Sequence, residues 1–209
     1  MSAKIFDSIL LKGIRAGQIP ARTDAAREWY RNQAKNISKE KEDVRIKRGV
    51  TGESLTRSAG DRARSRPLIG NMYTFRYDPK HKATLPYYDM FPLIFPINKA
   101  KGGILGINFH YLPPTLRAQL MDSLYDTSSN NDYDESTKLK ISYNILNAAS
   151  KYKFFKPTVK HYLTSQVKSQ LIYINPSEWD VALFLPTAKF VGANKQEVYA
   201  DSRKIAQKG

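Results

Sequence analysis

The sequence contains no cysteine, and its longest apolar runs are short. Without cysteine the chain has neither a disulfide framework nor a thiolate metal site. No apolar run reaches the about 20 residues that a membrane-spanning helix needs, and residues 1–17 have too short an apolar core for a secretory signal. We therefore expect a soluble protein that has no membrane partner and is not exported by that route.

Motifs of the common catalytic sites are also missing. The spacings of a phosphate loop, a dinucleotide fingerprint, a zinc site and a nucleophile elbow do not occur. The polar stretch at residues 126–135 lacks the glycine and terminal glutamate of a calcium-binding loop. A nuclease would need clustered carboxylates for magnesium, and Asp78 and Asp89 are a weak candidate pair for that task. We expect no enzyme activity, cofactor, metal or small-molecule substrate.

Acidic side chains are scarce beside basic ones, with 19 against 34, so the formal net charge is +15. The two ends hold most of this excess. Residues 1–66 carry 16 basic and 8 acidic side chains, and residues 151–209 carry 10 and 4. A basic excess favours a polyanionic partner, because cations that neutralise phosphates release counterions. Solubility, or complementarity to an acidic protein, would explain the same charge.

Composition and pattern divide the chain into four parts. We expect N-terminal helices over residues 1–36, a polar basic arm over 37–66, a globular α+β domain over 67–200 and a flexible tail over 201–209. The arm has few large apolar residues, so we expect it to become ordered only on a partner.

The central block, residues 73–114, has the pattern of a small β unit. Aromatic residues alternate with polar ones from residue 73 to 77, a polar stretch at 78–82 is typical of a hairpin tip, and an apolar run follows at 91–97. Gly102 and Gly103 then turn the chain into a last strand at 104–111. Since proline removes a ladder donor, Pro86, Pro92 and Pro96 predict short or edge strands.

Helical spacing returns at residues 115–125 and again up to residue 150, where Ser136 or Thr137 can cap the second helix. A strand is expected at 171–174, and a strand or short helix at 179–186. The fold class is therefore α+β: a small barrel-like or curved antiparallel β-sheet flanked by N-terminal and C-terminal helices, with a polar extended arm. We expect His110 to be a hydrogen-bonded structural residue.

Four groups of cations are candidates for DNA binding, because cations track phosphates and arginine can bind them bidentately. They are Lys12, Arg15 and Arg22 near the start; Arg57, Arg62, Arg64 and Arg66 in the arm; Arg76, Lys80, His81 and Lys82 at the hairpin tip; and Lys151, Lys153, Lys156 and Lys160. The last group is interleaved with Tyr152, Phe154, Phe155 and Tyr162, whose ring faces can accept unstacked bases. Those aromatic side chains can equally belong to the core and leave only a basic outer face.

Several sequence words together carry a resemblance: KGIRAGQIPART at residues 12–23, YDPKHKATLPYYDMFPLIFP at 77–96, GINFHYLPP at 106–114, KFFKP at 153–157 and EWDVALFLP at 178–186. The chain resembles virion proteins of contractile-tailed, T-even-like bacteriophages, and most of all the DNA end protector group. The resemblance implies a virion protein that also meets the host cytoplasm, binds the double-stranded end of the genome and shields it from host exonuclease. It transfers no catalytic residues.

Two functions follow from these observations. The first is a non-enzymatic virion protein that binds DNA through sequence-independent electrostatic contacts. The alternative is a structural subunit of the phage neck, tail or baseplate, whose basic arm docks on neighbouring virion proteins. Both would use the basic segments, so the charge pattern does not separate them.

Overall fold

Six strands form the main sheet, in the order β1-β7-β2-β4-β5-β6, and each neighbouring pair is antiparallel. The computed structural model describes residues 11, 12, 14, 15, 56, 57, 60–128, 130–179 and 187–208. The strands of this sheet are β1 (Ala63–Arg64), β2 (Met72–Thr74), β4 (Leu93–Ala100), β5 (Gly103–Asn108), β6 (Val159–Leu163) and β7 (Leu171–Ile174). A second, two-stranded sheet pairs β3 (Tyr88–Asp89) with β8 (Phe190–Val191).

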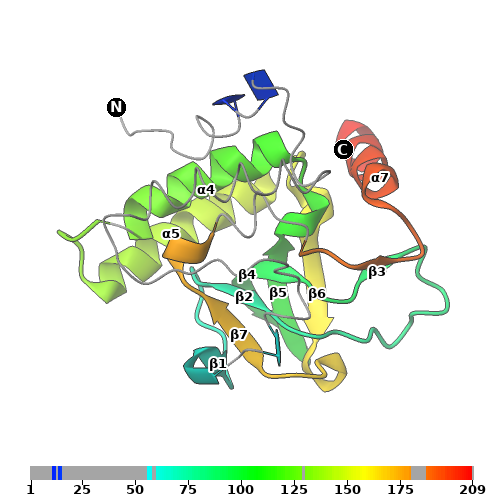
Figure 1. Cartoon of the computed structure of the whole chain (residues 1–209), viewed down its shortest axis with the longest axis horizontal. Helices are drawn as coiled ribbons and strands as arrows, with labels where there is room; N and C mark the ends of the chain where they lie inside the picture. The colour runs from blue at the N-terminus through cyan, green and yellow to red at the C-terminus, as the bar shows by residue number, and fades with distance from the viewer. Residues whose placement is uncertain are drawn as a thin grey trace.

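The helices confirm the α+β class. Helices α4 (Pro114–Ser128) and α5 (Glu135–Lys151) lie side by side across the main sheet in Figure 1, and α7 (Lys195–Lys208) packs at the end of the molecule near β6. Five short 3-10 turns join these elements: η1 (Gly60–Arg62), η2 (Phe109–Tyr111), η3 (Lys156–Thr158), η4 (Thr164–Gln166) and η5 (Pro176–Glu178). Among the described residues, none of the helices has the length and hydrophobicity that crossing a membrane requires.

The sheet is open, so the expectation of a barrel-like closure was wrong. Strands β1 and β6 stand at its two edges. A barrel requires every strand to have a partner on both sides. β1 contributes only two residues and pairs with β7 alone. The main sheet is therefore an open antiparallel sheet and not a barrel.

Both faces of the central strands are buried, which explains the unbroken apolar run at residues 91–97. Alternate residues of β4 point to opposite faces, with Leu93 and Phe95 on the helix side and Ile94 on the other. The main core on the helix side includes Met72, Leu93, Phe95, Ile107, Phe109, Leu120, Met121, Leu124, Leu146 and Trp179. The second cluster consists of Tyr73, Phe75, Tyr77, Ile94, Ile104, Tyr162 and Leu171.

The prediction of a short or edge strand is wrong for Pro96, because β4 has eight residues and lies between β2 and β5. Its missing N–H is tolerated for a local reason. The short β2 pairs only with Leu93 and Ile94, so the sheet on that side ends before Pro96 is reached. On the other side the register with β5 shifts between Pro96 and Asn98. A bulge of this kind accommodates proline inside a sheet.

Residues 78–82 are not the tip of a simple hairpin. β2 pairs directly with β4, so these residues belong to the long connection between the two strands. Backbone contacts tie the connection to the loop before β7: Tyr77 bridges Val167, and the Asp78 N–H donates to the Gln166 carbonyl at 3.1 Å. The β4–β5 hairpin does form as predicted. There Gly103 has no room for a side chain, since a Cβ would lie 2.1 Å from the Tyr162 carbonyl oxygen.

Two helix ends differ from expectation. α5 is capped by Asp134, whose carboxylate accepts from the Thr137 N–H at 2.7 Å, and not by Ser136 or Thr137. The C-terminal residues 201–208 continue α7 where a flexible tail was expected, and Ser202 and Ala206 bury one side of that helix. Predictions for residues 16–55 and 180–186 lie outside the described residues, which include only the last part of the polar arm.

Candidate nucleic-acid interface

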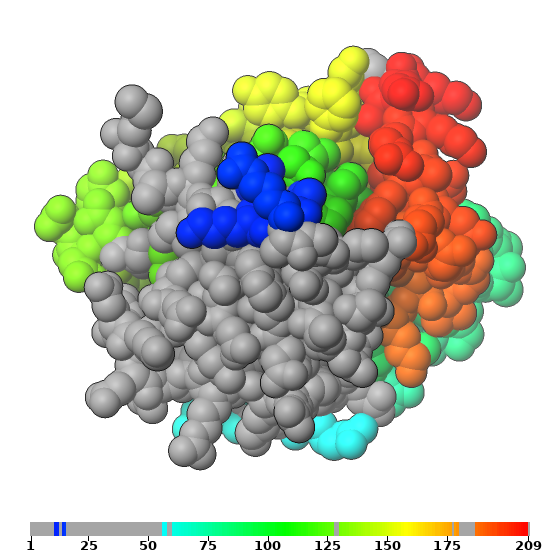
Figure 2. Space-filling view, turned by 45° about the horizontal axis from the view of Figure 1, so that its top comes forward, coloured from blue at the N-terminus to red at the C-terminus, as the bar shows by residue number. Residues whose placement is uncertain are grey.

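The predicted DNA-binding cations lie at several separate places on the surface. Arg22 lies outside the described residues. Twelve of the others are exposed: Lys12, Arg15, Arg57, Arg64, Arg66, Arg76, Lys80, His81, Lys82, Lys151, Lys153 and Lys156. Arg62 and Lys160 are half-buried. Figure 2 shows the turn that carries Lys12 and Arg15 at the surface, in blue, and the segment around residue 155, in yellow, beside α7.

One dense group of exposed cations is the lysine loop, residues 151–156, which links the end of α5 to η3. Lys151, Lys153 and Lys156 are all exposed, and in the described part of the chain none of them forms an ion pair with a carboxylate. Tyr152 and Phe154 lie between them with 65% and 53% of their surface exposed. The ammonium of Lys153 is 5.5 Å from the centre of the Phe154 ring. The loop thus presents charge and aromatic faces together.

Backbone hydrogen bonds hold the lysine loop in a defined turn. The carbonyl of Tyr152 accepts from the N–H groups of Phe155 and Lys156 at 2.9 and 3.1 Å. Phe155 packs against the main core, which anchors the turn. The aromatic residues of the segment therefore divide between the two predicted roles: Phe155 and Tyr162 pack inside, while Tyr152 and Phe154 face solvent.

Both of the half-buried predicted cations have intramolecular partners. The ammonium of Lys160 lies 4.2 Å from the centre of the Tyr111 ring, and burial lowers the pKa of this lysine. Arg62 donates to both carboxylate oxygens of Glu178, at 2.9 and 3.0 Å. These contacts compete with phosphate for the same donors.

The connection around residues 76–82 forms a second basic site. Arg76, Lys80 and His81 are exposed there, and Lys82 donates to the Asp78 carboxylate at 2.9 Å. The hydrogen bond to Lys82 lowers the pKa of Asp78, and the same bond raises the pKa of Lys82. Asp78 therefore neutralises one of the cations at this site.

A third basic site was only partly predicted. Arg64 and Arg66 line a groove together with Lys99 from β4 and Lys140 from α5. Neither lysine was proposed from the sequence, where each belongs only to a pair of lysines two residues apart, Lys99 with Lys101 and Lys138 with Lys140. Only the tertiary fold brings these four side chains to one place.

Asp89, the other carboxylate considered for metal binding, belongs to a buried polar network. Its carboxylate accepts hydrogen bonds from Asn108 Nδ2 at 3.2 Å and from the Phe91 N–H at 3.1 Å, and contacts His110 Nδ1 at 2.5 Å. His110 Nε2 lies 2.6 Å from Thr187 Oγ1. Burial lowers the pKa of His110, so the imidazole is neutral and Nδ1–H donates to Asp89 while Nε2 accepts from Thr187.

The order Asp89, His110, Thr187 has the connectivity of a nucleophilic triad, but all three side chains are almost fully buried. A nucleophile must reach its substrate, so this geometry does not form an accessible active site. Arg117 extends the network, donating to the Leu112 carbonyl at 2.7 Å and to the Tyr199 hydroxyl at 2.6 Å. These contacts join η2 to α4 and α7. Among the described residues no group of three or more metal-ligating side chains occurs.

Comparison with known families links the chain to a family of phage DNA-protecting proteins. The family model of the phage T4 terminal DNA protecting protein matches residues 25–208. No curated protein and no solved structure matches the chain. The resemblance to the DNA end protector group is confirmed by the family match, which covers most of the chain. The chain belongs to the phage T4 terminal DNA protecting protein family.

Proposed function

We propose that the protein binds the end of a linear phage genome without catalysing a reaction, and that sequence-independent contacts to the DNA backbone supply most of the affinity. The lysine loop carries this proposal, because it presents three exposed lysines and two exposed aromatic rings on one anchored turn. The family match gives the DNA end as the partner. The bound protein would shield that end from exonucleases in the host cell, and would travel in the virion with the DNA.

The physical basis is counterion release. Each lysine or arginine that neutralises a phosphate releases condensed cations, which favours binding to any sequence. Contacts of this kind position a protein on DNA but do not read bases. Lys151, Lys153 and Lys156 in the lysine loop, with Arg76 and Lys80, offer five such contacts on exposed surface. Lys160 and Arg62 are left out because each has an intramolecular partner.

Salt dependence tests this mechanism quantitatively. Five contacts predict that the logarithm of the duplex association constant falls with the logarithm of salt concentration with a slope of about −4.5. Fluorescence anisotropy with a labelled linear duplex over a range of salt concentrations measures the slope. An affinity that does not change with salt would contradict the electrostatic mechanism.

A matched pair of variants tests the role of the lysine loop. The triple variant K151Q/K153Q/K156Q should lower the steepness of the salt slope by about 3 and weaken protection of a linear duplex against an exonuclease. The control K101Q/K189Q/K208Q removes the same charge from exposed positions outside the lysine loop and the second basic site. Equal loss in both variants would show that net charge matters and the loop does not.

A further inference from the structure

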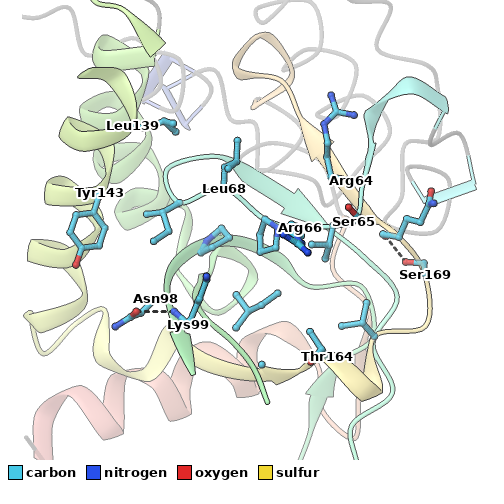
Figure 3. Close-up of a pocket in the computed structure, with 18 of the residues that line it drawn as sticks. Arg64, Ser65, Arg66, Leu68, Asn98, Lys99, Leu139, Tyr143, Thr164 and Ser169 are labelled. Carbon is cyan, nitrogen blue, oxygen red and sulfur yellow. Dashed lines mark hydrogen bonds between the residues drawn. The ribbon is translucent and has the colours of Figure 1, made fainter. Parts of the chain in front are cut away.

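A groove of about 1300 Å³ lies between residues 64–69, the β4–β5 hairpin and α5. Figure 3 shows Leu139 and Tyr143 on the helix at one side, with Arg64, Ser65 and Arg66 across from them and Lys99 between. Pockets for drug-sized ligands measure about 300–1,000 Å³, so this groove has room for a larger occupant. Its walls come from segments that are far apart in the sequence.

The charge along the groove has one sign. Arg64, Arg66, Lys99 and Lys140 line it, and among the described residues no aspartate or glutamate does. Within the described part of the chain, Arg66, Lys99 and Lys140 make no ion pair with a carboxylate. Cations that line a concave surface of low dielectric reinforce one another's field and attract an anion. Charge complementarity therefore indicates an anionic occupant.

The remaining wall is largely apolar. Leu68 is 55% exposed and Tyr143 is 36% exposed, although both lie beside the groove. Leu139, Val167, Ile104 and Leu171 contribute further apolar surface. A hydrated phosphate backbone alone would leave this surface without a partner. Single-stranded DNA offers both components, because its phosphates suit a cationic rim and its unstacked bases suit apolar and aromatic faces.

We propose that this groove holds the unpaired terminal nucleotides of a DNA strand, with phosphates at Arg66, Lys99 and Lys140 and bases against Leu68 and Tyr143. Inside an intact duplex the bases are paired and stacked, so they cannot enter. An end with a frayed or overhanging strand presents them. The inference rests on the proposed function and adds to it the feature of the DNA that distinguishes an end from an internal site.

Three DNAs of equal duplex length test the proposal with the full chain. One has a short single-stranded oligo-dT overhang, one is blunt, and one has both ends closed by hairpin loops made of a non-nucleotide linker. The overhang DNA should bind about tenfold more tightly than the closed DNA, since stacking of even one base on an aromatic side chain is worth about that factor. Equal affinities for all three would overturn the groove inference and leave DNA binding intact.

Groove variants separate this inference from the proposed function. L68A/Y143A should remove most of the preference for the overhang and leave the affinity for closed DNA unchanged. Y133A is the matched control, because Tyr133 is similarly exposed, at 39%, but does not line the groove. K151Q/K153Q/K156Q should instead weaken binding to all three DNAs alike. A groove variant that retains the preference would overturn the inference, whereas wild-type protein that binds no DNA would overturn the proposed function.

Photocrosslinking locates the strand end in the wild-type protein, so it does not depend on how the variants fold. An overhang with a terminal 5-iodouracil should crosslink to residues 64–69 or to α5 near Tyr143. Crosslinks found only outside the groove would overturn the inference. The groove variants give a second such outcome. If they keep the overhang preference but no longer enter phage particles, the occupant of the groove is a virion protein, and the inference is overturned.

Discussion

The buried network around Asp89 and the exposed lysine loop both contain charged side chains, but the surroundings of those charges differ. In the network each polar group has partners: the Asp89 carboxylate accepts from backbone and side-chain donors, and Arg117 donates to carbonyls and to Tyr199. In the loop the lysines have no carboxylate partner among the described residues and face solvent. Residue type alone therefore does not separate a structural role from a binding role, and burial does.

The Asp89→Ala substitution should give the largest effect of any single change, on stability. It leaves the buried donors of Asn108 and His110 and a backbone N–H without an acceptor. We expect the free energy of unfolding to fall by about 3 kcal/mol or more. Urea denaturation measures this loss. The control Asp78→Ala removes an exposed carboxylate and should change the free energy of unfolding by less than about 0.5 kcal/mol. A similar loss of stability in the two variants would contradict the contrast between the buried network and the exposed surface.

The Phe154→Ala substitution in the lysine loop should show the opposite pattern. The ring is 53% exposed, so its removal should change stability little. Loss of its stacking face should weaken binding to single-stranded DNA by about 1 kcal/mol or more. Anisotropy titration and thermal melting, done on the same preparations, measure the two quantities. A destabilised Phe154→Ala protein with unchanged DNA affinity would place this residue with the core.

The pH dependence of stability also tests whether the buried network around Asp89 behaves differently from exposed side chains. Burial holds the pKa of His110 below the ordinary value of about 6.5 that it regains on unfolding. The unfolded state therefore binds the extra proton first, so stability should be complete above about pH 6.5 and fall below it, by at most about 1.4 kcal/mol per pH unit.

Comparison of two histidine variants assigns this pH effect. His110→Gln should remove the dependence that begins below about pH 6.5, whereas His81→Gln should retain it, because His81 is exposed and lies outside the buried network. Urea midpoints at several pH values measure the difference. A pH dependence that survives in His110→Gln would show that another group is responsible.

The smallest expected effect concerns the N-terminus of α5. The Asp134 carboxylate accepts from the Thr137 N–H at 2.7 Å, which lowers the pKa of Asp134. Asp134→Ala should cost about 1 kcal/mol of stability and leave DNA binding unchanged. Ser136→Ala is the control, since Ser136 was the alternative cap candidate and makes no capping bond in the described structure. Thermal melting of the two variants distinguishes them.

The sequence predicted local features well and long-range pairing poorly. Helical spacing identified α4, the apolar run identified β4, and residues 171–174 formed the predicted strand β7. The hairpin assigned to residues 78–82 was wrong because β2 pairs with β4 across a long connection. Nothing in the local pattern of residues 75–92 reveals that β3 pairs with β8, about 100 residues later. Strand pairing depends on which faces must be buried together, and that is a property of the whole fold.

The candidate binding sites show the same difference between local features and long-range contacts. The three lysines and two exposed rings of the lysine loop are consecutive in the sequence, so composition and spacing were enough to single it out as a DNA-binding candidate. The groove is different, because Arg66 lies in the loop after β1, Lys99 in β4, and Lys140 and Tyr143 in α5. These side chains acquire a common field only when the sheet and α5 pack. Charge and aromatic content can be counted along a chain. Which of these side chains share a surface, and which are buried with partners, follows from packing that joins distant segments.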